Sequence, residues 1–292
     1  MKKANDDFKK RWQKQIIDNG SSNNDDNKLL IKSLDSANIK DYFENNFRSF
    51  SINIDRLPPY SFLLQLGFTL AKPYISRDDK AVYLCDNPIK KDRVFGLPLI
   101  EGSSWKGNMR WTARKRIEMD IGLTHDEKER KKKKLVSLFG NEKGDEENFR
   151  KGRLHFYPTF FDKIRLEVMN PQDRATRSGK DPILIETVPA NSDGVFSILY
   201  LPFDLLGLDT CETVKEFYDD LKFVTNVIKE MMLTYGFSAK KSSGFGTVIN
   251  KFSGSLVIKA FNRPFVFKKK KFEELEKHVE QLKQEVEAHA GR

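Results

Sequence analysis

The sequence predicts a domain of mixed helices and strands, the α+β class. Between residues 62 and 70, apolar side chains alternate with polar or small ones, and this period of two is typical of a half-buried strand. Between residues 214 and 231, apolar side chains recur every three or four positions, which indicates an amphipathic helix. Strand, helix, strands, helix and strand follow one another along the chain, and this order is that of a ferredoxin-like sheet.

A basic helix is predicted after the first strand. It runs from Ser104 to about Asp120 and ends near Gly122, where a glycine can close a helix. The charged run from Lys128 to Lys134 follows it. Such a run is more often a solvated face or loop than a binding site, and we interpret it in that way.

The remaining elements lie in the second half of the chain. Strand-like apolar runs cover 153–161 and 183–201, and a closing strand covers 255–261. After the basic residues 268–271, apolar residues at helical spacing predict a short C-terminal helix. This helix is too brief for a coiled coil, and we expect it to dock on a neighbouring protein.

Composition divides the chain into three parts. Residues 1–58 form a polar N-terminal extension, because the tract NGSSNNDDN at 19–27 is too hydrophilic to pack. Residues 59–262 form the main domain with insertions. Residues 263–292 hold a basic segment and the C-terminal helix.

The charge and the cysteine content narrow the class of protein. The 292 residues carry a net charge of +10, and this basic excess favours a polyanionic partner such as a nucleic acid. Cys85 and Cys211 are too few for a disulfide framework or a four-cysteine zinc site, so we expect no zinc and a reducing compartment. The N-terminus lacks the apolar core of a signal peptide, and no apolar run reaches about 18 residues. We therefore expect a cytoplasmic protein without a membrane partner.

The start of the basic helix has the features of a phosphate site. Ser103 or Ser104 is expected to cap the helix, and the remaining N–H groups and the helix dipole suit an anion. Gly102 and Gly107 lack a Cβ, so a sugar-phosphate chain can approach the backbone closely. Basic residues recur every four positions on one face of the helix: Lys106, Arg110 and Arg114. Taken alone, the same segment would also fit a serine-capped surface helix with solvated charges.

Four separated segments carry longer patterns. Residues 86–110 read D-x-P-I-x-x-D and then G-x-P-x-I-x-G-S-S-x-K-G-x-x-R, and residues 170–190 contain D-R-x-T followed by P-x-x-I-E-x-V-P-A. Gly152-Arg153-Leu154 enters a predicted strand, and residues 241–246 read KSSGFG. These segments resemble the RAMP superfamily of CRISPR proteins, and in particular the repeating guide-RNA-binding backbone subunit of type III effector complexes.

The resemblance implies a modified RNA-recognition fold with an inserted β-hairpin thumb, in subunits that stack along the guide RNA (crRNA). It implies as partners the guide RNA, the target RNA, other RAMP subunits, a small helical subunit and a large polymerase- or cyclase-like subunit. The residues that it assigns to RNA binding are Ser103, Ser104, Lys106, Gly107, Arg110, Arg174, Lys240, Lys241, Ser242, Ser243 and Gly244. Such residues contact phosphates, which leaves sequence recognition to base pairing with the guide.

The resemblance also bears on catalysis. In the cleaving members of the family, an aspartate in the loop before the proline supports metal-dependent cleavage of target RNA at regular intervals, and Asp86 matches that position. Its carboxylate would hold Mg²⁺ or another divalent cation. Asp78 and Asp79 are less favoured, because adjacent carboxylates in a loop are mostly solvated.

Three other functions stay open at this point. The first is an architectural or end-capping RAMP subunit without catalysis, which the long N-terminal extension favours. The second is a guide-processing endoribonuclease, which would use a histidine base, but no histidine lies between residues 58 and 102 and His155 falls in a predicted strand. The third is a generic RNA-recognition module, for which the expected aromatic-rich strand is not evident.

Overall fold

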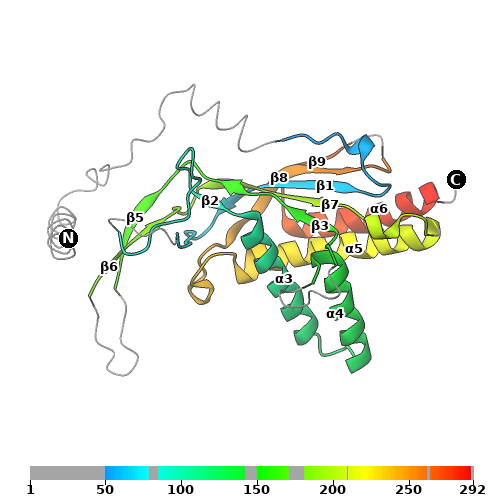
Figure 1. Ribbon diagram of the computed structural model, residues 1–292, viewed down its shortest axis with the longest axis horizontal. Helices are drawn as coiled ribbons and strands as arrows, with labels where there is room; N and C mark the ends of the chain where they lie inside the picture. Colours follow the sequence, from blue (N-terminus) through cyan, green and yellow to red (C-terminus); the bar gives the residue numbers. More distant parts are fainter. Residues whose placement is uncertain are drawn as a thin grey trace.

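An antiparallel five-stranded sheet forms the centre of the molecule (Figure 1). The computed structural model describes residues 50–78, 85–141, 150–170, 181–208, 210–261 and 264–290. The strand order is β3-β7-β1-β8-β9. The strands are β1 (Phe62–Leu70), β3 (Leu154–Phe156), β7 (Asp193–Tyr200), β8 (Val248–Ile258) and β9 (Phe265–Lys270). The predicted α+β class is confirmed.

Four α-helices accompany the sheet within the described residues. They are α3 (Gly102–Met119), α4 (His125–Phe139), α5 (Thr210–Glu230) and α6 (Phe272–Ala290), and a π-helical turn, η5 (Met231–Tyr235), continues α5. Short 3-10 turns are η3 (Ile54–Arg56), η4 (Phe203–Leu205) and η6 (Lys241–Ser243). Helices α5 and α6 lie along one face of the sheet, whereas α3 and α4 form a pair that extends away from it (Figure 1).

The core lies between the sheet and these helices. The alternation predicted for β1 is observed, because every second side chain from Phe62 to Leu70 is at most 2% exposed and faces the helices. The ring of Phe62 stacks on Tyr200 of β7 at 4.9 Å and lies edge-on to Phe217 of α5. The predicted helix over 214–231 is α5, which is somewhat longer and whose apolar stripe covers β1.

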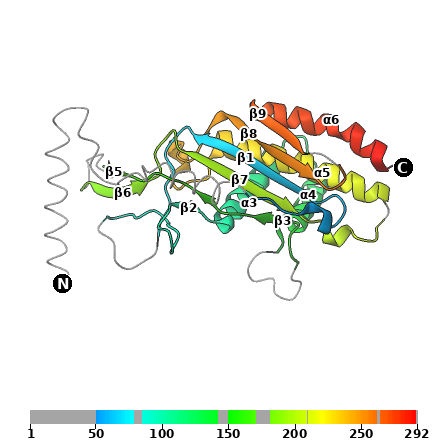
Figure 2. The same ribbon diagram turned by 90° about the horizontal axis from the view of Figure 1, so that it is seen from above.

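Two small sheets lie beside the main one. Strand β2 (Leu99–Ile100) pairs with β4 (Thr159–Phe160), and β5 (Arg165–Met169) pairs with β6 (Ile183–Thr187). The β5–β6 pair extends away from the main sheet, at the end of the molecule opposite to the C-terminal end of α6 (Figure 2). The predicted thumb is the stretch 170–180 between these strands in the sequence, but residues 171–180, including Arg174, lie outside the described residues.

The structure corrects several predicted boundaries. The apolar run 153–161 is two short strands, β3 and β4, and the run 183–201 is also two, β6 and β7. The closing strand begins seven residues earlier than predicted, at Val248, because it pairs along the whole of β1. Most of the N-terminal extension, residues 1–49, lies outside the described residues, and the three-part division stays a prediction.

The C-terminal region differs most from its prediction. The basic residues up to Lys270 belong to the edge strand β9, which the sequence analysis missed. Helix α6 packs on the chain's own α5, with Leu275, Val279 and Leu282 at most 1% exposed, and docking on a neighbouring protein stays a prediction. Ion pairs of 2.5 Å (Lys229 to Glu276) and 3.1 Å (Lys222 to Glu280) join the two helices.

A buried polar network holds α4 against the sheet. The lysine-rich run, predicted to be a solvated face or loop, forms the solvated face of α4 except at its end. There Lys134 Nζ lies 2.9 Å from the buried carboxylate of Asp220 on α5. Asp220 also accepts hydrogen bonds from Tyr200 Oη (2.8 Å) and Arg153 Nη1 (2.6 Å). Arg153 in turn donates to Asp204 from two nitrogens at 2.8 Å. The Gly-Arg motif before β3 is therefore a structural anchor.

Candidate nucleic-acid interface

The loop that carries Asp86 is fixed to strand β6. The Asp86 backbone N–H donates to the Leu184 carbonyl (2.9 Å), and the Leu184 N–H donates back to Asp86 Oδ2 (2.8 Å). One residue later the Glu186 N–H donates to the Asn87 carbonyl at 2.9 Å. The side chain of Asp86 is exposed. The structure thus presents one carboxylate at the surface, beside strand β6 and on a backbone that is bonded to that strand.

Two carboxylates near this loop, Glu186 and Asp78, contact lysines of the same chain. Glu186 accepts the Ile89 N–H (3.0 Å) and lies 2.8 Å from Lys91 Nζ. Asp78 is 5% exposed and lies 3.8 Å from Lys90 Nζ. Among the described residues no three histidine, cysteine or acidic side chains gather as a metal site. A divalent cation here would depend on Asp86 and on oxygens from a bound phosphate, a ligand set that Mg²⁺ accepts.

Helix α3 begins earlier than predicted, and its cap is different. Glu101 is the N-cap, without a side-chain capping bond, and the predicted caps Ser103 and Ser104 lie exposed inside the first turn. The first helical residue, Gly102, must lack a side chain, because a Cβ there would stand 2.4 Å from the Phe156 carbonyl oxygen of β3. Gly102 therefore allows the close packing of α3 on β3.

At position 107, by contrast, no close packing among the described residues requires a glycine. It lies on the exposed face of α3, and a Cβ there would meet nothing within 4 Å. A glycine inside a helix costs about 0.5–1 kcal/mol relative to alanine. A surface glycine that the fold does not need is consistent with a ligand that approaches the helix closely.

The predicted basic stripe on α3 divides into two roles. Arg110 Nη2 donates to the carbonyl oxygens of Phe139 (2.7 Å) and Gly140 (2.6 Å), so it caps the C-terminus of α4. These partners lie 29 and 30 positions further along the chain, so the spacing within α3 does not reveal them, and RNA binding by Arg110 stays a prediction. Lys106 is half-buried, and burial together with Arg110 lowers its pKa. Arg114 is exposed.

The glycine-rich turn is held firmly by its backbone. Lys240, Gly244 and Gly246 have positive φ angles of 57°, 78° and 71°. The Gly246 N–H donates to the Pro73 carbonyl at 2.8 Å, and a Cβ at Gly246 would stand 2.7 Å from the Ser238 nitrogen. Within this rigid turn Ser242 and Ser243 are exposed, as a phosphate contact requires.

The lysines of this turn reach two neighbouring elements. Lys240 Nζ contacts Met169 Sδ on β5, and Lys241 Nζ lies 4.6 Å from the ring centroid of Trp111 on α3. Trp111 was not among the predicted site residues, although an aromatic residue one turn after Gly107 on a basic helix was a signal for it.

The segment 73–78 joins the turn to the Asp86 loop. Its Ile75 carbonyl accepts the Ala239 N–H (3.1 Å) on one side, and its Ser76 carbonyl accepts Asn87 Nδ2 (2.9 Å) on the other. Lys90, next to this loop, also lies 3.6 Å from Glu101 at the start of α3. Three sequence segments that lie far apart, α3, the glycine-rich turn and the Asp86 loop, are therefore neighbours around one short connection.

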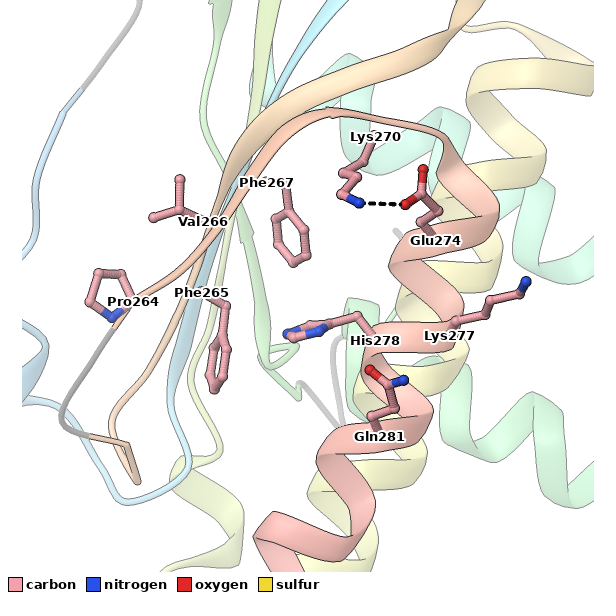
Figure 3. A pocket seen from close by; sticks show the side chains of 9 residues that line it. All are labelled: Pro264, Phe265, Val266, Phe267, Lys270, Glu274, Lys277, His278 and Gln281. Carbon is pink, nitrogen blue, oxygen red and sulfur yellow. Dashed lines mark hydrogen bonds and ion pairs between the residues drawn. The ribbon is translucent and has the colours of Figure 1, made fainter.

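A groove of about 550 Å³ lies elsewhere, between β9 and α6 (Figure 3). Phe265, Phe267 and His278 point into it, and the ion pair of Lys270 with Glu274 (2.7 Å) lies at one end. None of the residues predicted for RNA binding or catalysis lines this groove. The described helices also include none that is long and apolar enough to span a membrane.

Comparisons with known proteins agree with the sequence patterns. The chain is 28% identical over 173 residues to the CRISPR system Cms endoribonuclease Csm3 of Streptococcus thermophilus, which covers 58% of this chain and 76% of that protein. A chain in the cryo-EM structure of the Type III-B Cmr-beta bound to cognate target RNA aligns with a TM-score of 0.47 and 19% identity, over 81% of this chain and 69% of that one. The family model of the RAMP superfamily matches residues 84–291, which is more than half of the chain. This protein therefore belongs to the RAMP superfamily.

Proposed function

We propose that this protein is a guide-RNA-binding backbone subunit of a type III CRISPR effector complex. The observation that carries the proposal is the meeting of α3, the glycine-rich turn and the Asp86 loop around residues 73–78. Membership of the RAMP superfamily and the similarity to a CRISPR endoribonuclease support it. Its partners in the complex would be target RNA, other RAMP subunits, a small helical subunit and a large polymerase- or cyclase-like subunit.

The chemistry of this surface suits a phosphate backbone. Lys106 and Lys241 supply positive charge, Ser242 and Ser243 supply exposed hydroxyl donors, and the first turn of α3 supplies N–H groups without intrahelical partners. Such contacts position an RNA without reading its bases. Sequence recognition is then left to pairing between guide and target.

We further propose that Asp86 cleaves paired target RNA together with a divalent cation. The Leu184 N–H orients its carboxylate through the 2.8 Å hydrogen bond, so the other carboxylate oxygen has a defined direction. A cation held by Asp86 and the phosphate would stabilise the charge that develops during cleavage. Lys106 and the glycine-rich turn would fix the RNA backbone beside it.

The competing function is an architectural subunit that holds RNA without cleaving it. It is favoured because Glu186 and Asp78 are both engaged by lysines and the described residues contain no group of three histidine, cysteine or acidic side chains that could hold a metal ion. Under this function the cleavage chemistry would belong to another subunit.

The deciding experiment compares Asp86→Asn with wild type in the guide-loaded complex, using a labelled complementary RNA and Mg²⁺. Asparagine keeps an acceptor for the Leu184 N–H and removes only the charge. The matched control is Asp92→Asn in the same loop, where the carboxylate accepts the N–H groups of Val94 (2.9 Å) and Phe95 (2.8 Å). Loss of regularly spaced products in Asp86→Asn alone, with target binding intact, supports catalysis. Unchanged products in both variants would assign the protein to the architectural role.

A further inference from the structure

Lys241 of the glycine-rich turn rests on an aromatic side chain of α3. Its Nζ lies 4.6 Å from the centroid of the Trp111 ring, within the range of a cation–π contact. The Trp111 ring is itself held by Tyr235 of η5, whose ring stands perpendicular to it at 5.1 Å. Burial lowers the pKa of Lys241, so the contact with the ring offsets part of the cost of keeping the ammonium charged.

The contact fixes a side chain that would otherwise be mobile. A lysine has four rotatable bonds, and it loses much conformational freedom when its ammonium is held in one place. Because the ring holds the ammonium in place before any ligand binds, less conformational entropy is lost on binding, which is the general advantage of preorganisation.

The place where the ammonium is held is the surface expected to bind RNA. Trp111 follows Gly107 by one helical turn, so both lie on the same face of α3. Long side chains on a helix lean towards its N-terminus, so the Trp111 side chain is expected to lean towards the turn that contains Gly107. Gly107 leaves open space there, and the exposed Ser242 and Ser243 follow Lys241 directly.

We propose that Trp111 is a positioning residue for RNA binding, which holds the Lys241 ammonium beside the N-terminal half of α3 so that it contacts an RNA phosphate. This inference rests on the proposed RNA-binding function and adds a residue outside the family patterns described above. Its ligand is the phosphodiester backbone, and Trp111 contributes through Lys241 without touching the RNA. The flat π face is the required property, so phenylalanine would preserve the function and leucine would not.

The test measures the affinity of the full chain for a labelled uridine oligonucleotide as a function of salt concentration. Five proteins are compared: wild type, Trp111→Leu, Trp111→Phe, Lys241→Gln and the double variant Trp111→Leu with Lys241→Gln. We expect Trp111→Leu to weaken binding about two- to fivefold, the range of an exposed cation–π contact. The slope of log affinity against log salt concentration should become shallower by up to about 0.7, the value for one phosphate contact on a single strand.

The other variants separate positioning from direct contact. Trp111→Phe should bind like wild type, and the double variant should bind no more weakly than Lys241→Gln, because both substitutions remove the same phosphate contact. Thermal unfolding of each variant checks that α3 remains folded, and rescue by phenylalanine argues against a merely structural effect.

Two results would overturn the inference while leaving the proposed function intact. If Trp111→Leu weakens binding equally in the Lys241→Gln background, with an unchanged salt slope, the ring contacts RNA itself. If Trp111→Leu changes neither affinity nor slope while Lys241→Gln changes both, the ring does not position the lysine. By contrast, if replacing both Lys106 and Lys241 left RNA binding unchanged, the proposed RNA surface would be refuted, and the inference with it.

Discussion

Replacing Gly107 by alanine should stabilise the protein and weaken its binding to RNA. The position is in the interior of α3, and the added Cβ would meet no atom within 4 Å. Alanine is favoured over glycine in a helix by about 0.5–1 kcal/mol. For a chain of this size that corresponds to a rise in melting temperature of roughly 1–4 °C.

The loss of RNA affinity follows from the same geometry. The methyl group would stand on the exposed face of α3, where the sugar-phosphate chain is expected to approach. If it displaces one hydrogen bond to a phosphate, affinity should fall about tenfold or more, since a hydrogen bond to a charged group contributes about 1.5–3 kcal/mol. Thermal unfolding and a filter-binding titration with a guide RNA measure the two effects on one protein sample.

Gly102→Ala is the matched control in the same helix. Its Cβ would stand 2.4 Å from the Phe156 carbonyl oxygen, so this substitution should lower the melting temperature. Refutation would come from a stabilised Gly107→Ala variant that binds RNA as tightly as wild type, because the RNA would then not approach α3 at this turn. A destabilised Gly107→Ala variant would contradict the open space above the helix.

Three further predictions concern internal contacts of the fold. Arg110→Ala should cost about 1–3 kcal/mol of stability in urea unfolding, since it removes both bonds to the end of α4, yet leave cleavage unchanged in the complex. Asp220→Ala should cost about 3–5 kcal/mol in the same assay, because Arg153 and Lys134 lose their buried partner; a loss under 1 kcal/mol would contradict this network. Burial, Lys151 and Lys106 lower the pKa of His155, so His155 takes up a proton in the unfolded chain at a higher pH than in the folded one. The stability of the fold should therefore fall as the pH drops below about 6.5. Thermal unfolding of His155→Gln should show a smaller decline between about pH 7.5 and 5.5.

The sequence patterns predicted correctly those strands and helices that bury one face, because the buried face shows as a regular spacing of apolar residues. Strand β1 shows the alternation of a half-buried strand, and α5 shows a helical stripe, because each buries one face against the same core. The edge strand β9 was missed since its basic C-terminal half resembles a solvated linker. It is a strand because Phe265 and Phe267 pack under α6 and its backbone pairs with β8.

The candidate site was predicted in part. The patterns around Asp86 and the glycine-rich turn located two of its three segments, and the start of α3 located the third. The hydrogen bonds from Arg110 to the end of α4 were not predicted, because a side chain that reaches two carbonyls on another helix cannot be recognised from its spacing on its own helix. Trp111 was missed for the same reason, since its partner Lys241 lies in a different element.

The sequence by itself determined the α+β class, the basic character of the surface and the motifs of the RAMP superfamily, because periodicity, charge and short motifs are local properties. Only the tertiary structure decided which of the basic and glycine residues remain available for a ligand. Gly102 is used to pack α3 on β3 and Arg110 to cap α4, whereas Gly107 and the exposed serines stay open. The physical reason is that polar groups and close contacts are satisfied by partners distant in sequence, and those partners meet only when the chain has folded.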